Sequence, residues 1–222
     1  MKTRLNESDL AAVYGDLEVA NRAFRKRYPG IRSDRLPIHT LYGGAHLFKK
    51  ETPNKLGSLA LRHLTTYAPN FAEFARALEL PGADSLPVRV EAINALGDSL
   101  EGQASLSPEW ISATVYQRVV HKLAAEAIED QRLDFEDGYG ARADEEEDGH
   151  AVSAAMELAG GVKENLLPPF IGIRIKSLTE ETKRRSIRTL DLFLSKFAGQ
   201  GVSLPDPFFV TLPKVTSPEQ VS

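Results

Sequence analysis

The sequence predicts an α/β protein in which parallel strands are covered by helices on the outside. Strand-like and helix-like segments alternate along the chain, and 42% of its 222 residues are hydrophobic. The last three strand-like segments are spaced about 38 residues apart, which is typical of a βα unit that crosses back over a sheet. A chain of this length can bury roughly 70% of its unfolded surface, which excludes a disordered protein.

The N-terminal part, residues 1–35, is expected to be a helical extension. An amphipathic helix is predicted over residues 8–28, with Ser8 and Asp9 as N-caps and Pro29-Gly30 as its end. The apolar residues of this segment recur at steps of three and four, as on one helix face. They are Leu10, Val13, Leu17, Ala20 and Phe24.

The first strand is expected at residues 37–41 (PIHTL), followed by a turn at Tyr42-Gly43-Gly44. A helix is expected from Thr52-Pro53, because proline suits the first helical turn. The segment 81–107 has no sustained period, although Val88–Ile93 fits a short strand.

The second half of the chain shows the βα pattern most clearly. Ser107-Pro108 is expected to open a helix, and strands are predicted at 133–135, 170–175 and 208–212. Two further helices are predicted, one over 144–158 ended by Gly160-Gly161, and one over 180–197. The side chains expected to face inward from the latter are Ile187, Leu190, Leu194 and Phe197.

Composition restricts the function classes. The net charge is −4 and the pI is near 5.8, which does not indicate nucleic-acid binding. Cysteine is absent, so disulfides, thiolate metal sites and cysteine nucleophiles are excluded. No run of apolar residues is long enough for a signal peptide or a membrane span. We therefore expect a soluble protein of the cytoplasm that does not associate with membranes.

Working residues of parallel α/β folds lie where strands end, so the strand exits hold the candidates. After the first strand, Gly43 and Gly44 would let an anionic group of a ligand approach the backbone, and His46 could donate to it or act as a base. A tight turn that requires positive φ explains the same glycines.

Glu136 and Asp137 follow the second strand. With Gly138 beside them, they could hold a hydrated magnesium ion through their oxygens. The alternative is a helix cap or a salt bridge to Arg142. The acidic run 144–148 is interpreted as the solvated first turns of a helix and not as a metal site.

Arg174 interrupts an apolar strand, where a guanidinium is costly to bury unless it binds an anion. Its geometry suits a carboxylate of a substrate, and the alternative is a structural ion pair with Glu136 or Asp137. Lys214, after the last strand, could neutralise a substrate or contact a neighbouring acid. Alone, it would carry little weight.

Three segments in order resemble the HpcH/HpaI aldolase and citrate lyase β-subunit family. They are LDFEDGYG (133–140), GIRIKSL (172–178) and FVTLPKVTSPEQV (209–221). They are similar to that family's Leu-Glu-Asp strand end, its arginine-bearing strand and its Leu-Pro-Lys-Val strand. The segment 39–56 is similar in position to the family's first strand, although Tyr42-Gly43-Gly44 replaces the usual Val-Pro-Gly.

This resemblance implies a (β/α)8 barrel of the TIM type, of which residues 36–222 supply the first four βα units. It implies a Mg²⁺- or Mn²⁺-dependent lyase or aldolase that handles a 2-oxo acid, such as pyruvate or oxaloacetate, as its enolate. Arg174 would bind the carboxylate or enolate oxygen, Glu136 and Asp137 would lie beside the metal and its waters, and Lys214 would act electrostatically. A homo-oligomer is also expected.

The family's direct metal ligands come from its fifth and sixth strands, so we expect them from outside these 222 residues. The chain is then either truncated or dependent on a second polypeptide. Two other functions fit the same pattern: a phosphotransferase that handles phosphoenolpyruvate, and a non-catalytic half-barrel that assembles through exposed sheet edges.

Overall fold

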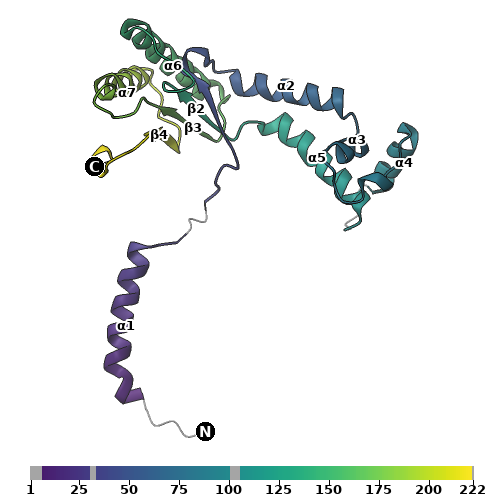
Figure 1. Ribbon diagram of the computed structural model, residues 1–222, viewed down its shortest axis with the longest axis horizontal. Coiled ribbons are helices and arrows are strands. Elements are labelled where there is room, and N and C mark those ends of the chain that lie inside the picture. Colours follow the sequence, from purple (N-terminus) through teal and green to yellow (C-terminus); the bar gives the residue numbers. More distant parts are fainter. Residues whose placement is uncertain (1–6, 31–33, 101–105, 222) are drawn as a thin grey trace. The chain divides into compact units, whose positions relative to one another are not determined.

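The computed structural model describes residues 7–30, 34–100 and 106–221, without the side chains of Glu7 and Asp9. The chain divides into two compact units, Met1–Leu36 and Pro37–Ser222. The first unit contains the helix α1 (Glu7–Arg27), which confirms the helix predicted over 8–28 (Figure 1).

Within the described residues of the second unit, four parallel strands form one sheet in the order β1-β2-β3-β4. The strands are β1 (Thr40–Gly44), β2 (Asp130–Asp134), β3 (Phe170–Arg174) and β4 (Phe208–Thr211). Their pairing aligns Gly44, Asp134, Arg174 and Thr211 in one row across the carboxyl end of the sheet. The predicted parallel α/β sheet is confirmed.

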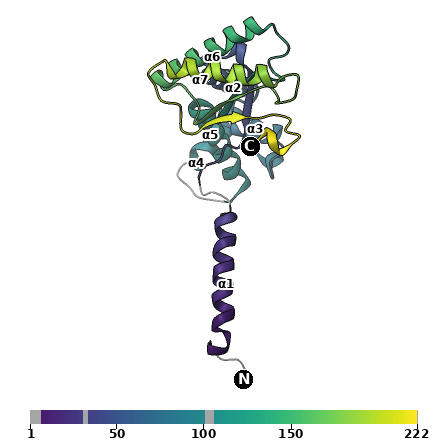
Figure 2. The ribbon, with the colours of Figure 1, turned by 90° about the vertical axis from the view of Figure 1, so that its left-hand side faces the viewer.

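One face of the sheet is apolar and carries the helices α6 (Asp144–Glu164) and α7 (Lys183–Ala198), which Figure 2 shows side by side. The fully buried Ile171, Ile173 and Ile175 share this face, as strand alternation predicts. From the helices, Leu158 and Phe193 pack into the same core. This face is therefore the main hydrophobic core of the unit.

The opposite face of the sheet is polar. β2 places Asp130, Arg132 and Asp134 on it, and β3 places Gly172 and Arg174 there. Asp130 and Asp134 are almost completely buried. Buried charges require partners, so this face concentrates the ion pairs of the sheet.

A helical segment with its own core lies between β1 and β2. It comprises α2 (Thr52–Tyr67), α3 (Phe71–Ala77), α4 (Val90–Leu100) and α5 (Pro108–Glu126). The strand expected at Val88–Ile93 is wrong, because α4 begins at Val90. Ile93, Leu96 and Leu100 follow a helical step and belong to the same cluster as Phe71, so packing selects the helix.

Two further expectations about helices are corrected. α6 does not stop at Gly160-Gly161 but continues to Glu164, and Asn165 caps it in the left-handed conformation. A Cβ on Gly161 would lie 2.4 Å from a methyl of Leu167, so this glycine serves packing and not helix termination. Ile187 on α7 is 54% exposed, because the buried stripe runs through Ser186, Thr189, Phe193 and Phe197.

None of the helices in the described part of the chain combines the length and the apolarity that a membrane crossing requires.

Candidate functional site

Arg174 and Asp134 form a two-pronged ion pair at the carboxyl end of β2 and β3. Arg174 donates from Nε to Oδ1 of Asp134 at 2.8 Å and from Nη2 to Oδ2 at 2.5 Å. Asp134 is fully buried and also accepts the backbone N–H groups of Glu136 and Gly138, both at 2.8 Å. Burial acts to raise the pKa of Asp134, but these hydrogen bonds outweigh it and the pKa lies below its usual value.

The remaining contacts of Arg174 hold its guanidinium in place. Its Cζ lies 4.3 Å from the ring centroid of Tyr42, a cation–π contact that reaches across β2 from strand β1. Its Nη1 is 3.6 Å from Glu136 and 3.9 Å from Asp137, and donates no hydrogen bond to any residue in the described ranges. The hydrogen bonds to Asp134 raise the pKa of Arg174. Nη1 is thus the nitrogen of the guanidinium that faces Glu136 and Asp137.

Lys214 completes the cluster from the loop after β4. Its ammonium pairs with Glu136 and lies 2.9 Å from Oδ1 of Asp137, which lowers the pKa of Asp137. The structure therefore brings together four of the predicted site residues, Glu136, Asp137, Arg174 and Lys214. The alternative partner, Arg142, pairs with a different residue, Glu146, at 2.7 Å.

The cluster carries one excess negative charge, because three carboxylates face the cations of Arg174 and Lys214. Oε2 of Glu136 is buried and has no hydrogen-bond partner among the residues that the structure describes. Even so, no group of three or more His, Cys, Asp or Glu side chains within residues 7–30, 34–100 and 106–221 is arranged to hold a metal ion. These residues therefore do not fit a directly bound metal ion.

Gly43 and Gly44 belong to β1 and do not form the turn predicted from the sequence. Both pair with β2, and neither has a positive φ. A Cβ on Gly44 would lie 2.5 Å from the backbone oxygen of Gly138, so the chain needs glycine there for close approach of β1 to the loop after β2. A Cβ on Gly43 would meet nothing within 4 Å.

His46 lies outside the Arg174 cluster, in a separate aromatic group with Tyr139 and His150. Its ring centroid is 5.4 Å from that of Tyr139 and 5.9 Å from that of His150. The Tyr139 hydroxyl and Nδ1 of His150 are hydrogen-bonded at 2.7 Å. Burial, followed by the charge of Arg142, lowers the pKa of His46. Burial also raises the pKa of Tyr139, to about 12.

The acidic run at the start of α6 is only partly solvated, which corrects the expectation from sequence. Glu147 is 1% exposed, pairs with Lys176 at 2.9 Å and accepts a hydrogen bond from Thr189. Asp148 binds Arg185 and Arg188 of α7. These two acids tie α6 to α7 and to the end of β3.

The DUF6986 family, described as a domain of unknown function, matches residues 17–222. The chain belongs to this family. No curated protein and no solved structure matches it.

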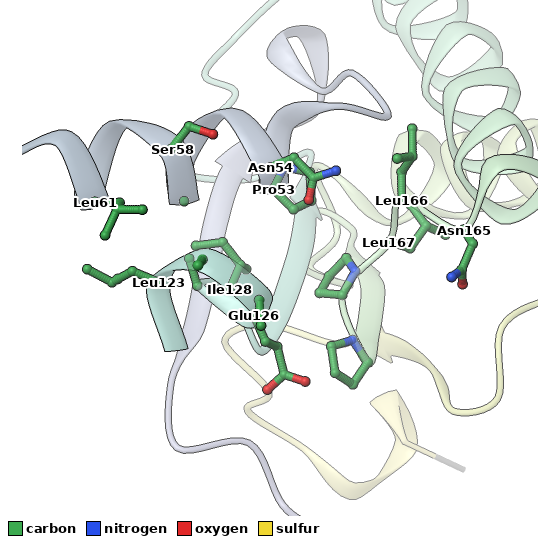
Figure 3. Close-up of a pocket in the computed structure, with 16 residues that line it drawn as sticks. Pro53, Asn54, Ser58, Leu61, Leu123, Glu126, Ile128, Asn165, Leu166 and Leu167 are labelled. Atoms are coloured by element: carbon green, nitrogen blue, oxygen red, sulfur yellow. The ribbon is translucent and has the colours of Figure 1, made fainter. Parts of the chain in front are cut away.

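A cavity of about 680 Å³ in the DUF6986 domain lies at the amino ends of the strands, away from the cluster (Figure 3). Residues just before β2 and β3 line it together with α2 and α5, among them Ile128, Pro168 and Pro169. None of the predicted site residues lines this cavity. The predicted site residues therefore lie at the other end of the strands from this cavity.

Two residues that contact Arg174, Asp134 and Tyr42, are not among the site residues predicted from the sequence. Asp134 precedes the Glu136-Asp137 pair by two residues and is aligned with Arg174 in the sheet register. An arginine inside a sheet needs a carboxylate on an adjacent strand, and Asp134 is the only acid of 133–135. That rule would have identified Asp134, whereas only the three-dimensional structure brings Tyr42 over the guanidinium.

Proposed function

We propose that this chain contributes the arginine-bearing part of a lyase or aldolase site for a 2-oxo acid such as pyruvate or oxaloacetate. The observation that carries the proposal is the meeting of Arg174 with Glu136 and Asp137 at the carboxyl ends of β2 and β3. The resemblance of these segments to the HpcH/HpaI aldolase and citrate lyase β-subunit family supports the proposal that they form an enolate-handling site.

The partial (β/α)8 barrel is part of the same proposal. The strand order β1-β2-β3-β4 follows the chain, as it does in successive units of such a barrel. A doubly wound sheet reverses its strand order at a switch point instead. Helices on one face and polar side chains on the other are compatible with the outside and the inside of a barrel wall.

In this site Arg174 binds and orients the substrate carboxylate. Asp134 and the Tyr42 ring fix two sides of the guanidinium, so that Nη1 remains for the substrate. Lys214, whose side chain is 59% exposed, can turn from the acids to an incoming anion. Positive charge held in place before the reaction stabilises negative charge that develops on the substrate oxygens.

The excess negative charge of the cluster weakens the binding of an anionic substrate that arrives alone. An anion alone is repelled by Glu136 and Asp137, whereas an anion that arrives with a divalent cation is not. Mg²⁺ or Mn²⁺, as the resemblance implies, would supply a Lewis acid for enolate formation. Glu136 and Asp137 would contact it through water, and its direct ligands would come from outside these 222 residues.

A second candidate is a non-catalytic half-barrel that assembles through its sheet edges. The Arg174–Asp134 ion pair is complete without a ligand, which favours a structural role. Within the described residues, β1 and β4 are edge strands, and Phe209 and Val210 of β4 are 36% and 40% exposed. Exposed apolar edges invite pairing with another chain.

Exchange of the pyruvate methyl protons in D₂O, followed by ¹H NMR with Mg²⁺ or Mn²⁺ present, tests the enzymatic proposal. With the cation held only through the waters beside Glu136 and Asp137, we still expect the folded chain to catalyse a slow exchange. Arg174→Lys should lose most of this rate, because lysine keeps the positive charge but not the two-nitrogen geometry of the guanidinium. Arg188→Lys is the matched control, since Arg188 also binds a carboxylate, that of Asp148, but joins α7 to α6 outside the cluster. Absence of exchange by folded protein, or full exchange by Arg174→Lys, favours the second candidate.

A further inference from the structure

Lys214 contacts the two adjacent carboxylates of the cluster from one side. Its ammonium pairs with Oε1 of Glu136 and lies 2.9 Å from Oδ1 of Asp137, so one positive charge bridges an oxygen of each acid. The other two oxygens of these acids face Nη1 of Arg174, at 3.6 and 3.9 Å. Proteins bind hydrated Mg²⁺ through one or two carboxylates, so the oxygens that Lys214 bridges also suit a divalent cation.

We propose that Lys214 acts as a built-in counter-ion in the proposed 2-oxo acid site, on which this role rests, and that a hydrated divalent cation must displace its ammonium to reach Glu136 and Asp137. The displaced ammonium then turns to the substrate anion. Lys214 therefore competes with the cation for the two acids and assists the binding of the anion.

Glu136 is the acid that most needs a positive charge. Its side chain is only 9% exposed, and Oε2 is buried without a hydrogen-bond partner among the described residues. A buried carboxylate is costly unless a cation or hydrogen-bond donors compensate its charge. In this structure Lys214 supplies that charge at Oε1. A divalent cation would bring twice the charge of the ammonium to the same carboxylate.

Lys214 can leave the acids without disturbing the fold. Its side chain is 59% exposed, so the ammonium can turn into solvent while the buried Glu136 stays in place. A lysine carries a compact charge on a flexible stem, which suits such a movement. The backbone of Lys214 has a φ of 51°, in the left-handed region that residues other than glycine seldom adopt. Hydrogen bonds to Asp137 and Glu136 raise the pKa of Lys214, so the side chain remains charged while it is paired.

The exchange couples the cation to the anion. While Lys214 pairs with the acids, its charge opposes the approach of a divalent cation, and it cannot contact the anion. An anion offers the ammonium a new partner and thereby frees the acids for the cation. By linkage, the cation then strengthens anion binding by the same factor.

Mn²⁺ binding to the full chain, measured by the loss of the free Mn²⁺ signal in electron paramagnetic resonance, tests the exchange without a substrate. We expect Lys214→Gln to bind Mn²⁺ about tenfold more tightly than the wild type, because one competing charge is removed. Lys214→Arg, which keeps the charge, should bind no more tightly than the wild type. Lys50→Gln is the matched control, since Lys50 also contacts two acids, Glu51 and Glu164, but their side chains are 43% and 51% exposed.

Three results of this titration overturn the proposal. They are an Mn²⁺ affinity of Lys214→Gln that is no higher than that of the wild type, an equal gain in Lys50→Gln, and the absence of Mn²⁺ binding by both the wild type and Lys214→Gln.

Pyruvate added to the same titration tests the coupling. We expect pyruvate to raise the Mn²⁺ affinity of the wild type by a larger factor than that of Lys214→Gln, and equal factors contradict the coupling. A wild type that binds pyruvate, while Lys214→Gln leaves the Mn²⁺ affinity unchanged, refutes only the role of Lys214. Tighter Mn²⁺ binding by Lys214→Gln, without pyruvate binding by the wild type, refutes the 2-oxo acid site and not the competition for the two acids.

Discussion

Replacement of Arg174 by alanine should cost the protein a large part of its stability. Asp134 is fully buried, and Arg174 supplies its only cation within hydrogen-bonding distance among the described residues. Removal of one partner of a buried ion pair costs about 3–5 kcal/mol. The two backbone N–H groups on Asp134 remain, so we expect about 3 kcal/mol.

Urea unfolding measures this loss. With a slope of about 2 kcal/mol per M, the midpoint should fall by about 1.5 M at pH 7. In the wild type the depressed pKa of Asp134 adds stability above its unfolded pKa, near pH 4, that is lost as the pH falls through the folded pKa. Without Arg174, burial raises that pKa, so the variant should gain stability as the pH falls from 7 toward 4.

Arg188→Ala provides the control. Arg188 also binds a carboxylate through two nitrogens, but its side chain is 59% exposed, so its removal should cost much less stability than the removal of Arg174. If Arg174→Ala loses no more stability than Arg188→Ala, or if its stability does not rise as the pH falls from 7 toward 4, the reasoning about the buried carboxylate is refuted.

Two further predictions follow from the same region of the sheet. Gly44→Ala should lower stability by about 1–3 kcal/mol, because its Cβ would lie 2.5 Å from the backbone oxygen of Gly138, whereas Gly43→Ala should be tolerated; equal thermal midpoints for the two variants would contradict this. Tyr139 should ionise near pH 12 in an absorbance titration. Because this pKa is raised from about 10, its contribution to stability is complete below pH 10 and is lost as the pH rises toward 12. Tyr139→Phe should remove this late-ionising group, and an unchanged titration curve would count against the assignment.

The parallel sheet could be predicted from the chain because the spacing of its strands is a local property. The repeats of apolar residues that predict β3 and α7 lie within short stretches of sequence, as does the proline at the start of α5. What the sequence alone did not reveal depends on contacts between distant residues. Gly44 looks like a turn glycine, and only the approach of Gly138 explains why it lies in a strand.

In the candidate site, too, local sequence signals could be recognised, whereas contacts between distant residues could not. The exits of β2, β3 and β4 could be identified from sequence, which brings Glu136, Asp137, Arg174 and Lys214 into one cluster. The deciding partner, Asp134, is the last residue of β2, so it lies just before the exit residues from which the site is predicted. His46 follows β1 as expected, but its ring turns to the aromatic group and not to Arg174.

Calorimetric titration of the full chain with pyruvate, with and without Mg²⁺, tests the proposed 2-oxo acid site most directly. We predict saturable binding that is stronger with Mg²⁺, because the cation offsets the negative charge of the cluster. Binding should weaken in Arg174→Lys, and propionate, which lacks the 2-oxo group, should bind less well. A folded chain that binds no pyruvate under either condition, or that binds it equally well after Arg174→Lys, would contradict the account.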